Sequence, residues 1–285
     1  MKLLAAALLS ALSAIPAPAQ YAAANREWNR PVEPFRVAGN IYYVGASGVS
    51  SYLITTPEGH FLLDSGFRET APMVEASIKK LGFRVGDIRF LLTSHGHYDH
   101  VGGVAQLKLH SKAMLLASPT EVALFQRGGK GDFAFGDKYA YPPVTPDRLL
   151  HDGEEVRLGA TVMTAHFTPG HTRGCTTWTT TVQEGAKLLH VVFPCSVSAP
   201  GYQLVNNPKY RGIQRDFEAT FTKLRALPCD IFLGLHSWEF DLLGKIKANE
   251  TDPTHNAFID AAGYLPHLDQ AQAAIREAVA KQARH

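Results

Sequence analysis

The chain has 285 residues, of which 45% are hydrophobic and 19% charged, which is enough for one large globular domain or two small ones. Its formal net charge is only +2 and no run of Lys and Arg occurs, so the composition argues against a nucleic-acid partner. The composition is that of an ordinary globular protein, and its function has to be inferred from motifs.

The first 19 residues are predicted to be a secretory signal peptide. Lys2 gives a basic start, and the apolar run from Leu3 to Ile15 is too short to span a membrane. Ala17-Pro18-Ala19 then forms an A-x-A cleavage signal before Gln20. A buried N-terminal helix is the alternative, but the prolines of this segment would stop it. No other long apolar segment occurs, so we expect residues 20–285 to be exported to the periplasm as a soluble protein without a membrane anchor.

The mature chain is predicted to form a single domain whose halves, about 20–150 and 151–285, share the order of their elements but not their sequence. In the first half we expect strands at 40–44, 52–55, 61–63, 90–92 and 113–116, and helices near 73–81 and 119–125. In the second half we expect strands at 156–158, 161–165, 176–182, 188–193 and 231–233, and helices at 217–227, 240–248 and 254–282, the last interrupted by Pro266. A two-sheet core with helices on both outer faces fits this pattern.

Four potential metal ligands lie within six residues, in the segment His95-Gly-His97-Tyr-Asp99-His100. The segment comes after the apolar strand at 90–92, so we expect a loop at the carboxyl end of that strand, where open α/β sheets usually place their sites. Alternate side chains of an extended loop point the same way, so His95 and His97 are predicted to share one metal, while Asp99 and His100 face a second. Ordinary surface or core histidines are the alternative, but this order of ligands is far more typical of a metal site.

The remaining ligands are predicted at strand ends in the second half. His171 lies in a turn between two strands, and His236 comes just after the strand at 231–233. The simplest partition gives one zinc ion His95, His97 and His171, and a second zinc ion Asp99, His100 and His236. Three protein ligands and an open position are the catalytic pattern, whereas structural zinc would be fully enclosed. Two zinc ions about 3.5–4 Å apart can share a hydroxide at neutral pH, which predicts a hydrolase.

Two further features leave alternatives open. Cys175 and Cys195 flank a hairpin with its turn near Glu184-Gly185. They either form a disulfide or are separated by a one-residue slip of the register. Cys229 is then left without a partner cysteine.

Residues 128–146 have little periodicity and are rich in Gly, Pro and aromatic residues. This long loop is either the wall or lid of a pocket or a satellite cluster that packs the loop onto the body.

The metal motif, together with Gly170-His171-Thr172 and the late His236, resembles the metallo-β-lactamase superfamily over residues 30–250. The resemblance implies an α/β fold, the αββα sandwich, in which two mixed β-sheets carry helices on both outer faces. The site is then expected at one edge of the sandwich.

The segment after the strand at 188–193 indicates the subgroup. Lactonases, thioesterases and nucleases of the superfamily usually carry a bridging Asp there, and residues 192–202 contain no carboxylate. Ser196-Val-Ser198-Ala-Pro-Gly-Tyr instead resembles subclass B3 β-lactamases, as do Gly128-Gly129 through Asp137 and Tyr141-Pro-Pro. The resemblance implies zinc-dependent hydrolysis of the β-lactam ring of penicillins, cephalosporins and carbapenems, by a hydroxide held between two zinc ions, and therefore antibiotic resistance. Another di-zinc hydrolase, such as a lactonase or thioesterase, and a non-catalytic exported zinc protein are the alternatives.

The resemblance also implies roles for residues around the metals. Ser196 and Ser198 are expected to bind the substrate carboxylate, or else to cap a turn before Pro200. Asp99 is expected to orient the hydroxide or pass a proton, in addition to binding zinc.

Three more side chains complete the expected site. Phe135 and Trp28 are predicted pocket walls, with core packing as the alternative for Trp28. Asp64 is expected to support a zinc-binding histidine, or else to form an Asx turn. We expect a monomer.

Overall fold

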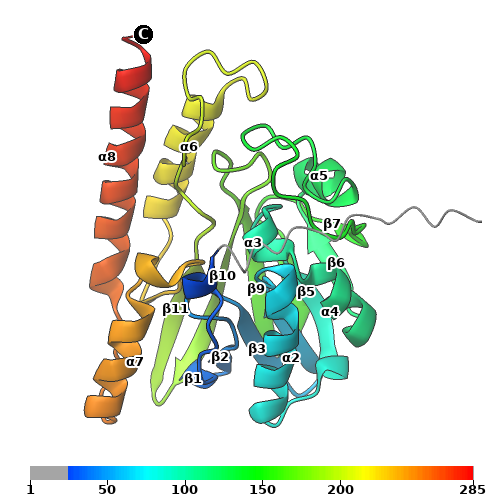
Figure 1. The fold of residues 1–285 in the computed structure, drawn as a ribbon. Coiled ribbons are helices and arrows are strands. Elements are labelled where there is room, and N and C mark those ends of the chain that lie inside the picture. The colour runs from blue at the N-terminus through cyan, green and yellow to red at the C-terminus, as the bar shows by residue number, and fades with distance from the viewer. Residues whose placement is uncertain (1–24, 285) are drawn as a thin grey trace, which may run out of the picture.

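The computed structural model describes residues 25–284, so the predicted signal peptide lies outside the described residues. Two sheets face each other (Figure 1). The larger has the order β1-β2-β3-β4-β5-β6-β7, and the smaller has the order β12-β11-β10-β9-β8. The strands of the larger sheet are β1 (Phe35–Ala38), β2 (Ile41–Tyr43), β3 (Tyr52–Thr56), β4 (Gly59–Leu63), β5 (Ile88–Leu92), β6 (Met114–Ala117) and β7 (Arg148–Leu149). Those of the smaller sheet are β8 (Glu155–Leu158), β9 (Thr161–Phe167), β10 (Thr176–Glu184), β11 (Lys187–Phe193) and β12 (Ile231–Phe232).

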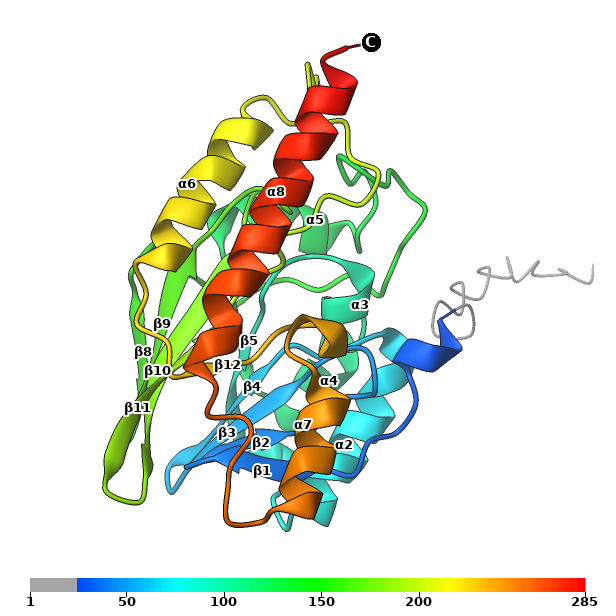
Figure 2. The same ribbon diagram turned by 90° about the vertical axis from the view of Figure 1, so that its left-hand side faces the viewer.

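Helices cover the outer face of each sheet, which gives the expected αββα sandwich (Figures 1 and 2). Helices α2 (Ala71–Lys80) and α4 (Val104–Ser111) pack on the larger sheet, and α6 (Ile213–Arg225) and α8 (Tyr264–Gln282) on the smaller one. Both sheets are mixed: β1 to β4 are antiparallel and β4 to β7 are parallel, while β12 is parallel to β11 in an otherwise antiparallel sheet.

The alternation of strand residues explains the two layers of core. In β4, Phe61 and Leu63 are buried in the core between the sheets, whereas Leu62 is buried with residues of α2 and α4. Successive side chains of a strand point to opposite faces, and a parallel strand covered on both faces is apolar throughout. The continuous apolar runs of the sequence are therefore central strands of this sandwich.

The carboxyl ends of the central strands position the site. β4 is parallel to β5 in the larger sheet, and β11 is parallel to β12 in the smaller one. The segments after these strands carry Asp64, the metal motif, Ser196 and His236. The isolated bridge between Val49 and His236 joins the two sheets at this edge.

Two expectations about elements were wrong, and two strands were not predicted. Strands β1 and β7 have only four and two residues, which is too few for a pattern to stand out. Residues 254–260 are not helical, and α8 begins only at Tyr264. Pro266 does not interrupt α8, because it lies in the first turn, where backbone N–H groups have no partner within the helix. No helix in residues 25–284 is both long and apolar enough to be a membrane span.

The pairing of Cys175 with Cys195, which the sequence left open, is a disulfide with a Cα–Cα distance of 5.8 Å. The hairpin ladder between β10 and β11 ends where Trp178 faces Phe193, and both cysteines lie just beyond that end. The chain there no longer keeps strict pairing, so the two residues meet although the register of the ladder would set them one position apart. Cys229 is free.

Candidate metal centre

The first group of donors consists of His95, His97 and His171, whose ligand atoms all lie within 4.8 Å of one another. His95 and His97 come after β5, and His171 lies in the turn between β9 and β10. His97 Nδ1 is 3.0 Å from His171 Nε2. The group therefore draws on loops from both sheets, as the sequence predicted.

The second group consists of Asp99, His100 and His236 and meets the same distance limit. Asp99 Oδ2 lies 3.6 Å from His100 Nε2 and 3.7 Å from His236 Nε2. The expectation of an extended loop was wrong here, because the short helix α3 (Tyr98–Val101) begins inside the motif, with the N–H of Val101 donating to His97 O. The helical turn separates this pair from His95 and His97. The rings of His95 and His100 are only 4.3 Å apart, so the two groups are adjacent.

In the first group, hydrogen bonds fix which ring nitrogen carries the proton. Ser94 Oγ donates to Asp64 Oδ2 (2.6 Å), so it accepts from His95 Nδ1 (3.0 Å). His171 Nδ1 donates to the carbonyl of Ser198 (2.7 Å). The Nε2 atoms of His95 and His171 therefore keep their lone pairs. His95 Nε2 is buried without a hydrogen-bond partner among the described residues, and His171 Nε2 faces His97 Nδ1.

Each of the other three rings also has an oxygen beside its outward nitrogen, although the contacts of His97 and His100 do not meet hydrogen-bond geometry. His100 Nδ1 lies 3.3 Å from Asp64 Oδ2, His236 Nδ1 lies 3.2 Å from the carbonyl of Gly48, and His97 Nε2 lies 3.5 Å from Asp132 Oδ2. Each acceptor occupies the nitrogen that faces away from the cluster, which is the arrangement by which proteins orient metal-binding histidines.

Burial keeps most of these rings uncharged. It lowers the pKa of His95 and of His171 well below the ordinary value, and the neighbouring histidines lower both further. Burial and His100 also lower the pKa of His236 to about 4. Burial opposes ionisation of Asp99, but His100 and His236 outweigh it and hold the pKa of this carboxyl below its usual value. His95, His171 and His236 thus present neutral imidazoles beside the Asp99 carboxylate. His100 differs, because Asp99 and Asp64 outweigh its burial and raise the pKa of its imidazole.

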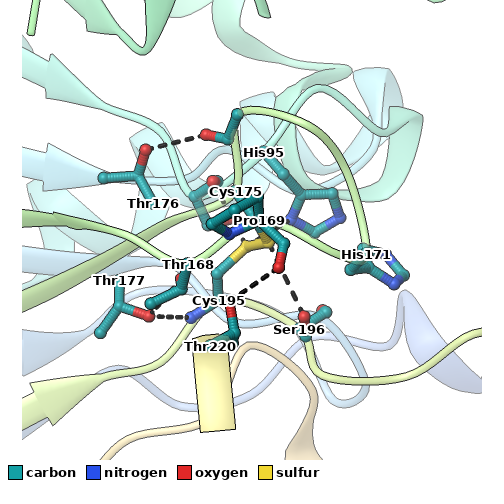
Figure 3. Close-up of a disulfide and its surroundings, with 12 residues drawn as sticks. His95, Thr168, Pro169, His171, Cys175, Thr176, Thr177, Cys195, Ser196 and Thr220 are labelled. Atoms are coloured by element: carbon teal, nitrogen blue, oxygen red, sulfur yellow. Dashed lines mark hydrogen bonds between the residues drawn. A yellow bond between two sulfur atoms is a disulfide. The ribbon is translucent and has the colours of Figure 1, made fainter. Parts of the chain in front are cut away.

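This donor set fits zinc. Imidazole nitrogen and carboxylate oxygen are its usual ligands, and a catalytic site offers three of them. A third group, His95 with Cys175 and Cys195, also lies within 4.8 Å, but its two sulfur atoms are bonded to each other beneath His95 (Figure 3). A buried nitrogen that lacks a hydrogen bond, next to other bare lone pairs, is costly unless a cation binds there. The two histidine-rich groups are therefore candidate metal sites.

The other residues predicted for the site lie around its rim. Ser196 is buried, and its hydroxyl has no partner among the described residues, whereas Ser198 is exposed. The Phe135 ring is 5.2 Å from that of His97, and the Trp28 ring is 5.5 Å from that of His236. Asp64 supports both His95, through Ser94, and His100.

Sequence reasoning missed three residues that shape the site. Asp132 faces His97 from the loop at 128–146, which was interpreted as a wall or lid or as a satellite cluster, without a role for this carboxylate. Glu121 is buried and accepts the backbone N–H groups of Gly96 and Gly174, both at 2.8 Å. The Trp238 ring stacks on His236 at 4.4 Å. The only signals in the sequence were that Asp132 is a lone carboxylate in a glycine-rich stretch and that Trp238 lies two residues after His236.

Comparison with known proteins places the chain in a family. The model of the metallo-beta-lactamase superfamily matches residues 44–233. The structure of FEZ-1, a metallo-beta-lactamase from Legionella gormanii, is 41% identical and superposes with a TM-score of 0.88, covering 90% of this chain and 99% of that one. A Cronobacter sakazakii metallo-beta-lactamase with an HARLDQ motif is 40% identical with a TM-score of 0.88, covering 91% and 99%.

A further similar structure is named as a member of a particular subclass. BJP-1 of Bradyrhizobium japonicum, a subclass B3 metallo-beta-lactamase, is 36% identical with a TM-score of 0.86, covering 92% of this chain and 98% of that one. Curated sequences match over less: a probable metallo-hydrolase of Burkholderia pseudomallei is 33% identical over 41% of this chain, which spans 38% of that protein. The chain belongs to the metallo-β-lactamase superfamily, and its structural relatives include enzymes named as subclass B3.

Proposed function

We propose that this protein hydrolyses the β-lactam ring of penicillins, cephalosporins and carbapenems with two zinc ions. The observation that carries the proposal is the pair of adjacent three-donor groups, in which each histidine has an oxygen on its far side. The absence of a carboxylate in residues 192–202 supports a β-lactamase over the lactonases and thioesterases of the superfamily.

His95, His97 and His171 would hold one zinc ion, and Asp99, His100 and His236 the other. When bound, zinc lowers the pKa of water to about 7 and polarises a carbonyl as a Lewis acid. The protein supplies the orientation. Ser94, Asp64, Asp132 and the carbonyls of Ser198 and Gly48 fix the rings, so that no side chain has to reorganise during the reaction.

The ionised Asp99 carboxylate accepts a hydrogen bond from the attacking water and orients it toward the ring carbonyl. Asp99 has little exposure, 8%, so bulk water competes weakly for this carboxylate. Its lowered pKa keeps it an acceptor at neutral pH.

Ser196 and Ser198 would bind the carboxylate that all these antibiotics carry. The Ser196 hydroxyl is buried and unpartnered among the described residues, so a substrate oxygen would relieve an unsatisfied donor. We expect Ser196→Ala to raise KM about fivefold to tenfold, in line with about 1 kcal/mol for one hydrogen bond, and to leave kcat nearly unchanged. Steady-state kinetics on a cephalosporin checks this, and a fall in kcat with unchanged KM would contradict it.

The function is tested with purified protein, a chromogenic cephalosporin, a carbapenem and a thioester. Turnover of both antibiotics should disappear on chelation and return with zinc. If the protein binds two zinc ions and hydrolyses only the thioester, the β-lactamase proposal is wrong.

We also propose that the protein acts in the periplasm. The signal-like first 19 residues support export, and the Cys175–Cys195 disulfide is typical of an oxidising compartment. Cell fractionation, with N-terminal sequencing that should begin at Gln20, tests this proposal. A full-length chain in the cytoplasm would overturn it.

A further inference from the structure

A cavity of about 420 Å³ lies between helix α5 (Val122–Gln126), the loop at 128–146 and the two segments that carry Thr172 and Lys209. None of the six metal donors lines it, so an occupant can bind there without displacing a metal ligand. Pockets for small organic molecules have volumes of about 300–1,000 Å³. The cavity is therefore large enough for such a molecule, and the chemistry of its lining indicates which kind.

Three cationic side chains from separate parts of the chain line the cavity, Arg127, Arg173 and Lys209. Among the described residues, none of the three forms an ion pair with a carboxylate. Arg127 Nε donates to the carbonyl of Lys130 at 2.9 Å, and Arg173 donates to the carbonyl of Lys209 and lies over the ring of Tyr210. The Lys209 ammonium donates to no group in the described part of the chain. The three side chains therefore bring positive charge to one cavity without a contacting counter-charge.

Two carboxylates also line the cavity, but both bind other groups. Glu121 is buried, and each of its oxygens accepts a backbone N–H at 2.8 Å. Asp132 is buried as well. Its Oδ1 accepts two backbone N–H groups at 2.8 Å, and its Oδ2 faces His97. Because their oxygens are engaged in this way, neither carboxylate neutralises the cations of the lining.

The rest of the lining includes an apolar wall and one unused donor. Phe133, Leu124 and Ala123 form the wall, and the ring of Phe133 packs edge-on against that of Tyr210 at 4.9 Å. Thr172 is 2% exposed, and its hydroxyl has no hydrogen-bond partner among the described residues. A buried hydroxyl without a partner is costly, and an acceptor in the cavity would satisfy it. The lining thus combines cations and a hydroxyl with an apolar surface.

We propose that this cavity binds a small organic anion with an apolar body, such as an aromatic carboxylate. The carboxylate binds to the cationic side chains, and the body packs on Phe133 and Leu124. Hydrogen bonds between charged groups are roughly twice as strong as neutral ones, so the charge of the ligand matters. An inorganic anion would leave the apolar wall without a partner. The inference does not depend on the proposed function, because binding requires no turnover.

The test titrates the zinc-loaded protein with three probes in a calorimeter. Naphthoate carries both features, naphthamide has the same body without the charge, and inorganic phosphate has the charge without the body. Naphthamide and phosphate should each bind at least about tenfold more weakly than naphthoate, because each lacks one of the two contacts. Bound naphthoate should also raise the unfolding temperature, since a ligand of the folded state stabilises it. Equal binding of naphthamide would refute the role of the cations, and equal binding of phosphate would refute that of the wall.

Variants show where naphthoate binds. Lys209→Gln should lower its affinity about tenfold, because the ammonium loses a charge-assisted hydrogen bond. Arg211→Gln is the matched control, since Arg211 is an exposed cation two residues further on that does not line the cavity, and its effect should stay below about twofold. Arg127→Gln removes a cation from a different segment and should act like Lys209→Gln.

Naphthoate can also bind zinc, but binding at the metals would not respond to the cations of the cavity. Affinity that neither Lys209→Gln nor Arg127→Gln lowers, or that Arg211→Gln lowers equally, therefore overturns the proposal. A wild-type protein that does not bind naphthoate overturns it as well. Because all of these measurements report binding, they leave the β-lactamase proposal untouched.

Discussion

Both groups of donors contain histidines, but they differ in net charge and in the residues that pack around them. His95, His97 and His171 are three imidazoles, whereas Asp99 adds a carboxylate to His100 and His236. A divalent cation would keep its full charge in the first group and be partly neutralised in the second. The first group rests on a disulfide, and the second is covered by the rings of Trp28 and Trp238. The metal ion in the first group, which lies against the disulfide, is therefore expected to be the stronger Lewis acid.

The largest effects should come from removing one ligand from each group. His171→Ala and His236→Ala should each lose about one metal equivalent and more than about 100-fold in kcat/KM. Mutating a residue that only hydrogen-bonds a metal ligand typically lowers metal affinity or activity about 10–100-fold, and removing the ligand itself should cost more. Metal analysis and steady-state kinetics check both. Unchanged turnover in His171→Ala would refute the first group as a catalytic site.

Asp64→Asn should weaken both groups, because Asp64 supports His95 through Ser94 and faces His100 directly. We expect a loss of about 10–100-fold in affinity for each metal. Asn tolerates the left-handed backbone of this position (φ 57°), so the fold should persist. Competition with a chromogenic chelator measures both affinities, and a loss confined to one metal would contradict the shared role.

Asp132→Asn should weaken only the first group, because the ring that Asp132 faces is that of His97. We expect the affinity for the first metal to fall about tenfold and the affinity for the second metal to stay unchanged. The same chelator titration, run beside Asp64→Asn, separates the two carboxylates. Equal losses at both metals would remove the distinction between the groups.

Removing the disulfide should have the smallest effect on metal binding. Cys175→Ala with Cys195→Ala should lower the free energy of unfolding by about 3 kcal/mol, as expected for a loop of this length, 20 residues apart in sequence. Affinity should fall only at the first group, because Cys195 Sγ is 3.6 Å from His95 Nδ1. Denaturant unfolding measures the stability, with reduced wild-type protein as the control. A larger loss at the second group would contradict this account.

The fold and the six metal donors could be predicted from the sequence because both depend on local patterns. Apolar runs such as 61–63 marked central strands, and the spacing of His95 and His97 marked one metal group. The split between the groups was right, but its cause was not, since a turn of helix α3 places Asp99 and His100.

What the sequence could not predict was support that comes from distant residues. Asp132 and Trp238 approach the histidines only in the folded chain, so no local pattern distinguishes them from other carboxylates and aromatic residues. The pairing of Cys175 with Cys195 was left open for the same reason, since its geometry depends on where a ladder stops.

Glu121 limits how this protein can change. Its carboxylate receives the N–H groups of Gly96, beside two ligands, and of Gly174, on the opposite sheet. A Cβ at Gly96 would overlap Glu121 Oε2 and Leu124 Cδ2, and one at Gly174 would overlap Glu121 Cγ and Thr120 Oγ1. A shorter residue at 121 would leave two buried amides unsatisfied and would still not make room for either side chain. These three positions should therefore stay unchanged when the enzyme is selected for new substrates.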